Sequence, residues 1–113
     1  MLSLGAAPIY LYRQAVDMRR SFDGLSALVA AAFPGQLTVG AYFVFVNHRR
    51  THVKLLYWDG DGLVQWYKRL ERGCFRVPLA GSESLTRRDL LLLLEGITPR
   101  RLAPRYRLGE AVG

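Results

Sequence analysis

The stretch HVKLLYWDGDGLVQWYKRL, residues 52–70, consists of two apolar runs separated by a turn with two glycines. Aromatic and β-branched residues occur in both runs, as is typical of strands. Asp-Gly is a strong hairpin signal, because glycine tolerates the positive φ angles of tight turns. We therefore expect strands over His52–Trp58 and Leu63–Leu70, joined by a structural turn of Asp59, Gly60, Asp61 and Gly62.

Further strands are expected on both sides of this hairpin. The run Gly40–Asn47 is apolar and ends in a polar turn, so it forms the preceding strand. A first short strand is expected over Ile9–Arg13, and a last one over Cys74–Val77, closed by Pro78. The sequence thus predicts an α+β fold, an antiparallel β-meander of about four to five strands with two helices packed on it.

The two helices are expected before and after the meander. Apolar residues spaced by three and four predict one helix from Met18 to Phe33, capped by Asp17 and ended by Pro34-Gly35. A small-residue linker over Ala80–Ser84 leads to the second. Thr86 and Asp89 nearly match a capping box there, and Gly96 ends the helix. The leucine run over 90–94 should be buried against the sheet or a partner subunit.

The middle strands are apolar on both faces. Val53, Leu55 and Tyr57 lie on one side of their strand, and Leu56 and Trp58 on the other. A sheet with one solvated face would alternate more cleanly between apolar and polar residues. The second face therefore needs a cover, which is either the second helix or another subunit.

One domain accounts for the length of 113 residues. We expect a single α+β domain over residues 1–98 and a flexible basic C-terminal tail over 99–113, because the tail combines arginines and prolines without periodicity. Cys74 is the single cysteine, which fits a reducing compartment. No stretch reads as a signal peptide or a membrane span, so the expected location is the cytoplasm.

The chain is basic, with 16 Lys plus Arg against 9 Asp plus Glu and a formal net charge of +7. A basic surface attracts nucleic acid, anionic membrane or an acidic protein, although a bias towards arginine also keeps a chain soluble. Aromatic residues stand between the basic ones and could stack bases or fill the core. The candidate nucleic-acid contacts are Arg49, Arg50, Lys54, Lys68, Arg69, Arg72, Arg100, Arg101, Arg105 and Arg107.

Catalytic and metal sites find little support. Asp59 and Asp61 could hold Mg²⁺, as in a metal-dependent nuclease, but Asp is also favoured in turns for its own hydrogen bonds. His48 and His52 lack two further zinc ligands. Cys74 as a nucleophile lacks a base at any suggestive spacing. We therefore expect no catalytic residue, no metal and no cofactor.

Several strings resemble a known family in their order and spacing. They are Val16–Leu25, Phe43–Asn47 with Arg49-Arg50 after it, Lys54–Leu63 continued by Trp66–Glu71, and Leu93–Ile97. They are similar to the small accessory protein, called TnpB and encoded by the second open reading frame, of the IS-sixty-six type of bacterial insertion sequences. The resemblance covers roughly residues 1–97, with the string Tyr-Trp-Asp-Gly-Asp-Gly as its most specific part.

The resemblance implies a non-catalytic accessory role in transposition, in which a separate, larger transposase cuts and joins the DNA. The implied partners are that transposase and DNA, with no membrane; self-association into a homo-oligomer is also open. Two other functions remain, a metal-dependent nuclease centred on Asp59 and Asp61, and a protein-interaction module without DNA contact. The family carries no catalytic residues that could be transferred to this chain.

Overall fold

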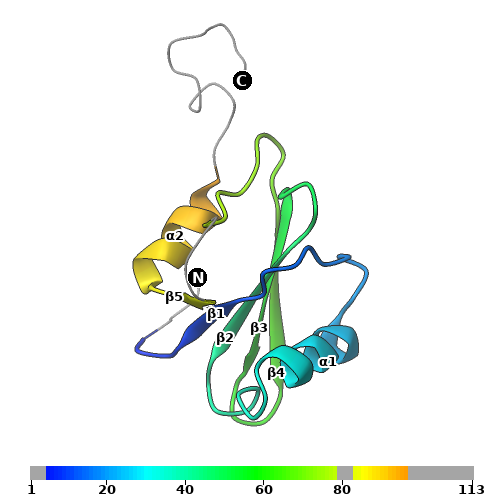
Figure 1. Cartoon of the computed structure of the whole chain (residues 1–113), viewed down its shortest axis with the longest axis vertical. Helices are drawn as coiled ribbons and strands as arrows, with labels where there is room; N and C mark the ends of the chain where they lie inside the picture. Colours follow the sequence, from blue (N-terminus) through cyan, green and yellow to red (C-terminus); the bar gives the residue numbers. More distant parts are fainter. Residues whose placement is uncertain (1–4, 79–82, 97–113) are drawn as a thin grey trace, which may run out of the picture.

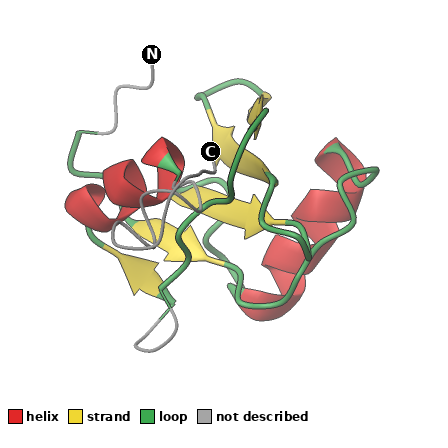
Figure 2. Cartoon of the chain, turned by 90° about the horizontal axis from the view of Figure 1, so that it is seen from above, coloured by secondary structure: helices red, strands yellow, loops and turns green. Residues whose placement is uncertain are grey.

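The structure, a computed structural model, describes residues 5–78 and 83–96. A five-stranded sheet lies between two helices, one on each face (Figures 1 and 2). The predicted α+β class is confirmed. Along the chain the elements are β1 (Ile9–Leu11), α1 (Phe22–Ala32), β2 (Tyr42–Val46), β3 (His52–Trp58), β4 (Leu63–Arg69), β5 (Ser84–Leu85) and α2 (Arg87–Glu95).

The antiparallel hairpin of β3 and β4 forms as the sequence predicts. Its register runs without a break from His52 opposite Arg69 to Trp58 opposite Leu63. In the connecting turn, the Asp59 N–H donates to the Gly62 carbonyl over 2.8 Å. Gly60 has a φ of +86°, which a residue with a Cβ rarely adopts.

The N-terminal part of the sheet is not a meander. Strand β1 pairs in parallel with β2, Ile9 lying opposite Tyr42, and the sheet order is β4-β3-β2-β1-β5. Parallel neighbours need a long crossover connection, and α1 is part of that crossover. The predicted antiparallel meander is therefore limited to β2, β3 and β4.

The prediction of a strand over Cys74–Val77 is wrong. Of these residues only Cys74 makes a β-bridge, and that bridge is isolated. The Phe75 N–H donates to the Arg50 carbonyl, and the Phe75 ring is fully buried, so this segment closes over the core. The last strand is instead β5, which begins inside the predicted linker and pairs antiparallel with β1. Strand β5 pairs with the side of β1 that faces away from β2.

Helix α1 ends before Pro34 as predicted, but it begins at Phe22, four residues later than Met18. Asp17 does not cap it. The Asp17 carboxylate instead accepts from the Arg19 N–H in a tight turn. The carbonyls of Met18 and Arg20 both bind the ammonium group of Lys54, so they point towards the sheet and do not continue a helix.

Helix α2 begins with the predicted capping box. The Asp89 N–H donates to the Thr86 hydroxyl, and the Thr86 N–H donates to the Asp89 carboxylate. The helix ends at Gly96, whose φ is +72°. Leu90, Leu93 and Leu94 are buried as predicted, whereas Leu91 is 44% exposed and Leu92 39% in the single chain, so burial of these two against a partner subunit stays a prediction.

Each helix covers its own core, so both faces of the sheet are buried as the strand composition predicts. On the α1 face, Leu25 and Val29 pack with Phe43, Phe45 and Leu56. On the α2 face, the core residues are Ile9, Leu11, Val44, Val46, Val53, Leu55, Phe75, Leu85, Leu90, Leu93 and Leu94. No helix among the described residues is long and apolar enough to cross a membrane.

The turn between β3 and β4 allows a matched test of backbone strain. A Cβ added at Gly60 or at Gly62 would meet no atom within 4 Å, and of the two only Gly60 has a positive φ. We expect Gly60→Val to lower the free energy of unfolding by about 1–2 kcal/mol more than Gly62→Val, because a left-handed residue with a Cβ is strained. Urea unfolding of both variants measures the difference, and equal losses would contradict the role of Gly60.

The leucine run offers a second comparison. Leu93→Ala should lower the free energy of unfolding by about 2–5 kcal/mol, because it leaves a cavity in a fully buried position. Leu91→Ala removes a half-exposed side chain and should cost roughly 0.5 kcal/mol or less in the monomer. Thermal or urea unfolding checks this order, and a larger loss at Leu91 would show that a further surface covers it.

Candidate nucleic-acid interface

Six arginines gather at the end of the sheet where β1, β2 and β4 finish. The chain segments that carry them are tied together. The Leu70 N–H donates to the Thr51 carbonyl over 2.8 Å, the Phe75 N–H donates to the Arg50 carbonyl over 2.6 Å, and Arg13 donates to the Pro78 carbonyl. All six are exposed. This group, called the basic end from here on, comprises Arg13, Arg49, Arg50, Arg69, Arg72 and Arg76.

The turn between β2 and β3 is held in shape by the side chain of Asn47. Its carboxamide oxygen accepts from the N–H groups of Thr51 and His52, each over 2.9 Å. Its nitrogen donates to the Thr51 hydroxyl over 3.1 Å and lies 3.2 Å from His52 Nδ1. Arg50 has a φ of +60°, so the turn reverses there. These bonds fix the backbone that carries His48, Arg49 and Arg50.

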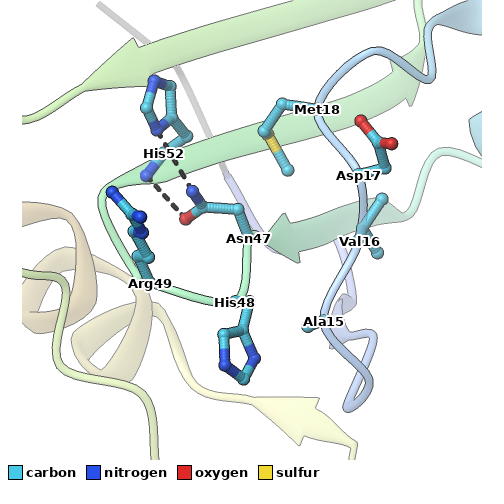
Figure 3. A pocket seen from close by; sticks show the side chains of 8 residues that line it. All are labelled: Ala15, Val16, Asp17, Met18, Asn47, His48, Arg49 and His52. Atoms are coloured by element: carbon cyan, nitrogen blue, oxygen red, sulfur yellow. Dashed lines mark hydrogen bonds between the residues drawn. The ribbon is translucent and has the colours of Figure 1, made fainter.

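Two open hollows lie on either side of this turn. One, of about 520 Å³, is bounded by residues 15–18 and by the turn with His48, Arg49 and His52 (Figure 3). The other, of about 300 Å³, is lined by Arg13 and Arg50, among others. Cationic and imidazole groups on a shaped surface suit the oxygen atoms of a phosphate.

Few carboxylates oppose the basic end. Asp17 is bound by Arg19 at 2.6 Å, and this hydrogen-bonded guanidinium lowers the pKa of Asp17 to about 2. Glu71 binds Arg69 at 2.9 Å. Within residues 5–78 and 83–96, no carboxylate lies within 4.0 Å of Arg49, Arg50 or Arg72 in an ion pair. Their charges therefore remain available to an outside anion.

Lys54 does not belong to this surface, although the sequence places it among the candidate contacts. The residue is only 4% exposed, and its Nζ donates to the carbonyls of Met18 and Arg20, each over 2.8 Å. The ammonium also lies 4.7 Å from the centre of the Tyr67 ring. Burial lowers the pKa of Lys54. We therefore treat this lysine as a structural residue.

Lys68 is also engaged within the fold. Its Nζ donates to the Leu94 carbonyl over 3.0 Å, at the C-terminal end of α2. A cation at that end satisfies a free carbonyl and complements the helix dipole. Arg69 and Arg72 follow at the end of β4 and belong to the basic end. Arg100, Arg101, Arg105 and Arg107 lie outside the described residues.

The aromatic residues between the basic ones do not form one stacking surface. Neighbouring residues of a strand point to opposite faces. Trp66 therefore packs with the α2-side core, and Tyr67 stands over Lys54 on the α1 side. Tyr57 and Trp58 are divided in the same way. The basic and aromatic residues that are neighbours in the sequence therefore lie on opposite faces of the sheet.

Sequence reasoning missed Arg13 and Arg76. Arg13 follows β1, and the parallel pairing of β1 with β2 places it at the same edge as the Asn47 turn. The strand–helix–strand order of the N-terminal half was a signal for this pairing, because such units are typical of parallel strands. Arg76 reaches the basic end because Phe75 is bound to Arg50.

The turn with Asp59 and Asp61 lies at the other end of β3, roughly 20 Å away along the strand. Within the part of the chain that the structure describes, no three side chains of His, Cys, Asp or Glu form a group that could hold a metal ion. The two carboxylates therefore have no third ligand of these types there, and neither do His48 and His52.

Comparisons with known proteins give one family and one relative. The family model described as "IS66 Orf2 like protein" matches residues 7–104. A protein of Sinorhizobium fredii (strain NBRC 101917 / NGR234), named "Uncharacterized protein y4jC", is 35% identical over 91 residues, which cover 79% of this chain and 78% of the relative. No solved structure matches the chain.

The role of Lys54 can be tested by Lys54→Met, which keeps most of the apolar stem. Loss of the two hydrogen bonds to Met18 and Arg20 should lower the free energy of unfolding by about 1–3 kcal/mol. The control Arg72→Met removes an exposed charge and should change it by less than about 0.5 kcal/mol. Urea unfolding compares the two variants. An unchanged unfolding midpoint for Lys54→Met would show that the two hydrogen bonds of Lys54 do not stabilise the fold.

Proposed function

The chain belongs to the family of IS66 Orf2 like proteins, and we propose that it is a non-catalytic accessory protein of insertion-sequence transposition that contacts DNA through its basic end. The family match confirms the resemblance found in the sequence. It links the chain to an insertion sequence, and the proposed partners, DNA and the transposase of the element, follow from that link. The proposed location is the cytoplasm, where the DNA of a bacterium lies.

The observation that carries the proposal is the gathering of arginines from separate segments at one end of the sheet. Arg13 follows β1, Arg49 and Arg50 follow β2, and Arg69 and Arg72 lie at the end of β4 and just after it. A guanidinium presents several donors in a planar fork that suits phosphate oxygens. The net charge of +7 adds long-range attraction to a polyanion.

The expected mode of binding is to the phosphate backbone. The described arginines are held on a rigid turn and on strand ends, which can position a duplex but do not by themselves read base edges. Such contacts release counterions and make affinity fall steeply with salt. We therefore propose binding that depends weakly on sequence, with the choice of site left to the transposase.

A salt titration tests this contact. Arg49→Ala with Arg50→Ala should weaken binding to duplex DNA and flatten the plot of log affinity against log salt by about 0.9 per lost phosphate contact, at most about two contacts. The matched control changes Arg87 and Arg88 to Ala, two exposed neighbouring arginines at the start of α2. Fluorescence anisotropy of a labelled duplex at several salt concentrations gives both slopes.

Two outcomes would count against the proposal. If both double variants flatten the slope equally, net charge alone explains the binding and the basic end has no special role. If the wild-type protein binds no duplex at low salt, direct DNA contact is excluded. The arginines would then be a docking surface for acidic residues of the transposase, which co-purification of the wild type and of the Arg49 and Arg50 variant would measure.

A further inference from the structure

Strand β4 is an edge of the sheet, since among the described residues it pairs with β3 alone. Its outward-facing groups follow from two hydrogen bonds of the hairpin. The Leu70 N–H donates to the Thr51 carbonyl, and the Asp59 N–H donates to the Gly62 carbonyl. Antiparallel pairs alternate between bonded and non-bonded positions, so the even-numbered residues of β4 bond to β3. The N–H and C=O groups of Leu63, Gln65, Tyr67 and Arg69 therefore point away from the sheet.

Most of this edge lacks the usual protection against pairing. An exposed edge strand is commonly protected by proline, by charged side chains, by a bulge or by extreme shortness. Strand β4 has seven residues, contains no proline, and keeps an unbroken register with β3. Its basic residues, Lys68 and Arg69, are confined to one end, and the acidic Asp61 lies just before the other. A strand with opposite charges at its two ends is complementary to an antiparallel copy of itself.

We propose that two copies of this chain associate through β4, antiparallel and with Gln65 opposite the partner's Gln65, so that one sheet runs through both copies. The backbone fixes part of this register. Outward-facing residues must lie opposite outward-facing residues, and in this register Leu63 lies opposite the partner's Tyr67. The pairing rests on β4 and on its end charges and does not depend on DNA binding.

Charge favours the antiparallel arrangement, but side chains and not charge choose the register. With Gln65 on the two-fold axis, the turn residue Asp61 faces the partner's Arg69, whereas Asp59 faces the partner's Glu71. With Val64 on the axis, Asp59 would face the partner's Arg69. In both registers the acidic turn of one copy lies near the basic end of β4 in the other, where opposite charges stabilise a strand pair.

The side chains near the axis agree with the same register. Val64 lies beside the partner's Trp66 on the α2 face, and Leu63 beside the partner's Tyr67 on the α1 face, where Tyr67 is now 50% exposed. Aromatic and aliphatic cross-strand pairs stabilise sheets. The carboxamide oxygen of Gln65 is buried and has no hydrogen-bond partner within the described residues. A rotation of this amide towards the axis would give it a donor on the partner's Gln65.

The pairing has a consequence for the basic end. A two-fold axis through β4 reverses the strand direction, so the basic ends of the two copies lie at opposite ends of the joined sheet. If the proposed DNA contact holds, one dimer therefore presents two separate phosphate-binding surfaces. This arrangement would suit two DNA segments better than one continuous site.

Charge reversal tests the interface. Asp61→Arg and Arg69→Asp should each raise the dimer dissociation constant about tenfold or more, because two attractive pairs become repulsive. The double variant with both changes should recover the wild-type constant. Arg88→Asp, the same charge change at an exposed position of α2, should leave it unchanged. Sedimentation equilibrium measures all four, and circular dichroism verifies that each variant is folded.

Cysteine cross-linking tests the register in a Cys74→Ser background. In a bonded antiparallel pair the Cα atoms are about 5.5 Å apart, which a disulfide can span. Gln65→Cys should therefore form a covalent dimer on mild oxidation, and Leu63→Cys should not. A wild-type monomer at all concentrations, a dimer that no charge reversal weakens, or a cross-link at Trp66→Cys in place of Gln65→Cys would overturn the proposal. The DNA titration on Arg49 and Arg50 is independent of these results.

Discussion

The buried ammonium of Lys54 is the interaction on which the N-terminal half of the structure depends. A charge enclosed in a protein is costly unless it is well bonded, and here two carbonyls of the 18–20 segment and the Tyr67 ring surround it. Because the segment is tied to β3, α1 begins only at Phe22. The helix then packs on Phe43 and Leu56 and completes the crossover between β1 and β2.

The parallel pairing that this crossover permits also creates the basic end. Parallel strands finish at the same edge, so Arg13 after β1 lies near the turn that follows β2. The side chain of Asn47 fixes that turn, and Phe75 ties the segment after β4 to it. The proposed phosphate contacts therefore come from segments that are distant in sequence, and their geometry depends on backbone hydrogen bonds more than on contacts between the arginines.

Helices on both faces leave the sheet two kinds of free surface, its ends and its edges. One end is basic, and the other carries the turn with Asp59 and Asp61. This separation of charge along the strands makes an antiparallel copy of β4 a fitting neighbour. The same feature explains why the acidic turn and the basic end do not neutralise each other within one chain, since the length of β3 lies between them.

The parts of the protein that rest on local chemistry were predictable from the sequence alone. The two glycines set the β3–β4 hairpin, Thr86 and Asp89 set the start of α2, and apolar residues on both sides of β3 required covers on both faces. The strings around Tyr57 and Trp66 were enough to indicate the family. Three features became apparent only in the folded chain: the parallel β1–β2 pair, the late start of α1, and β5 in place of the strand expected at Cys74–Val77. The tertiary structure also divided the basic candidates, enclosing Lys54, engaging Lys68 at the end of α2 and adding Arg13 and Arg76 to the exposed group. The physical reason is that strand pairing and the burial of a lysine depend on partners far along the chain, which local periodicity and turn propensity do not record.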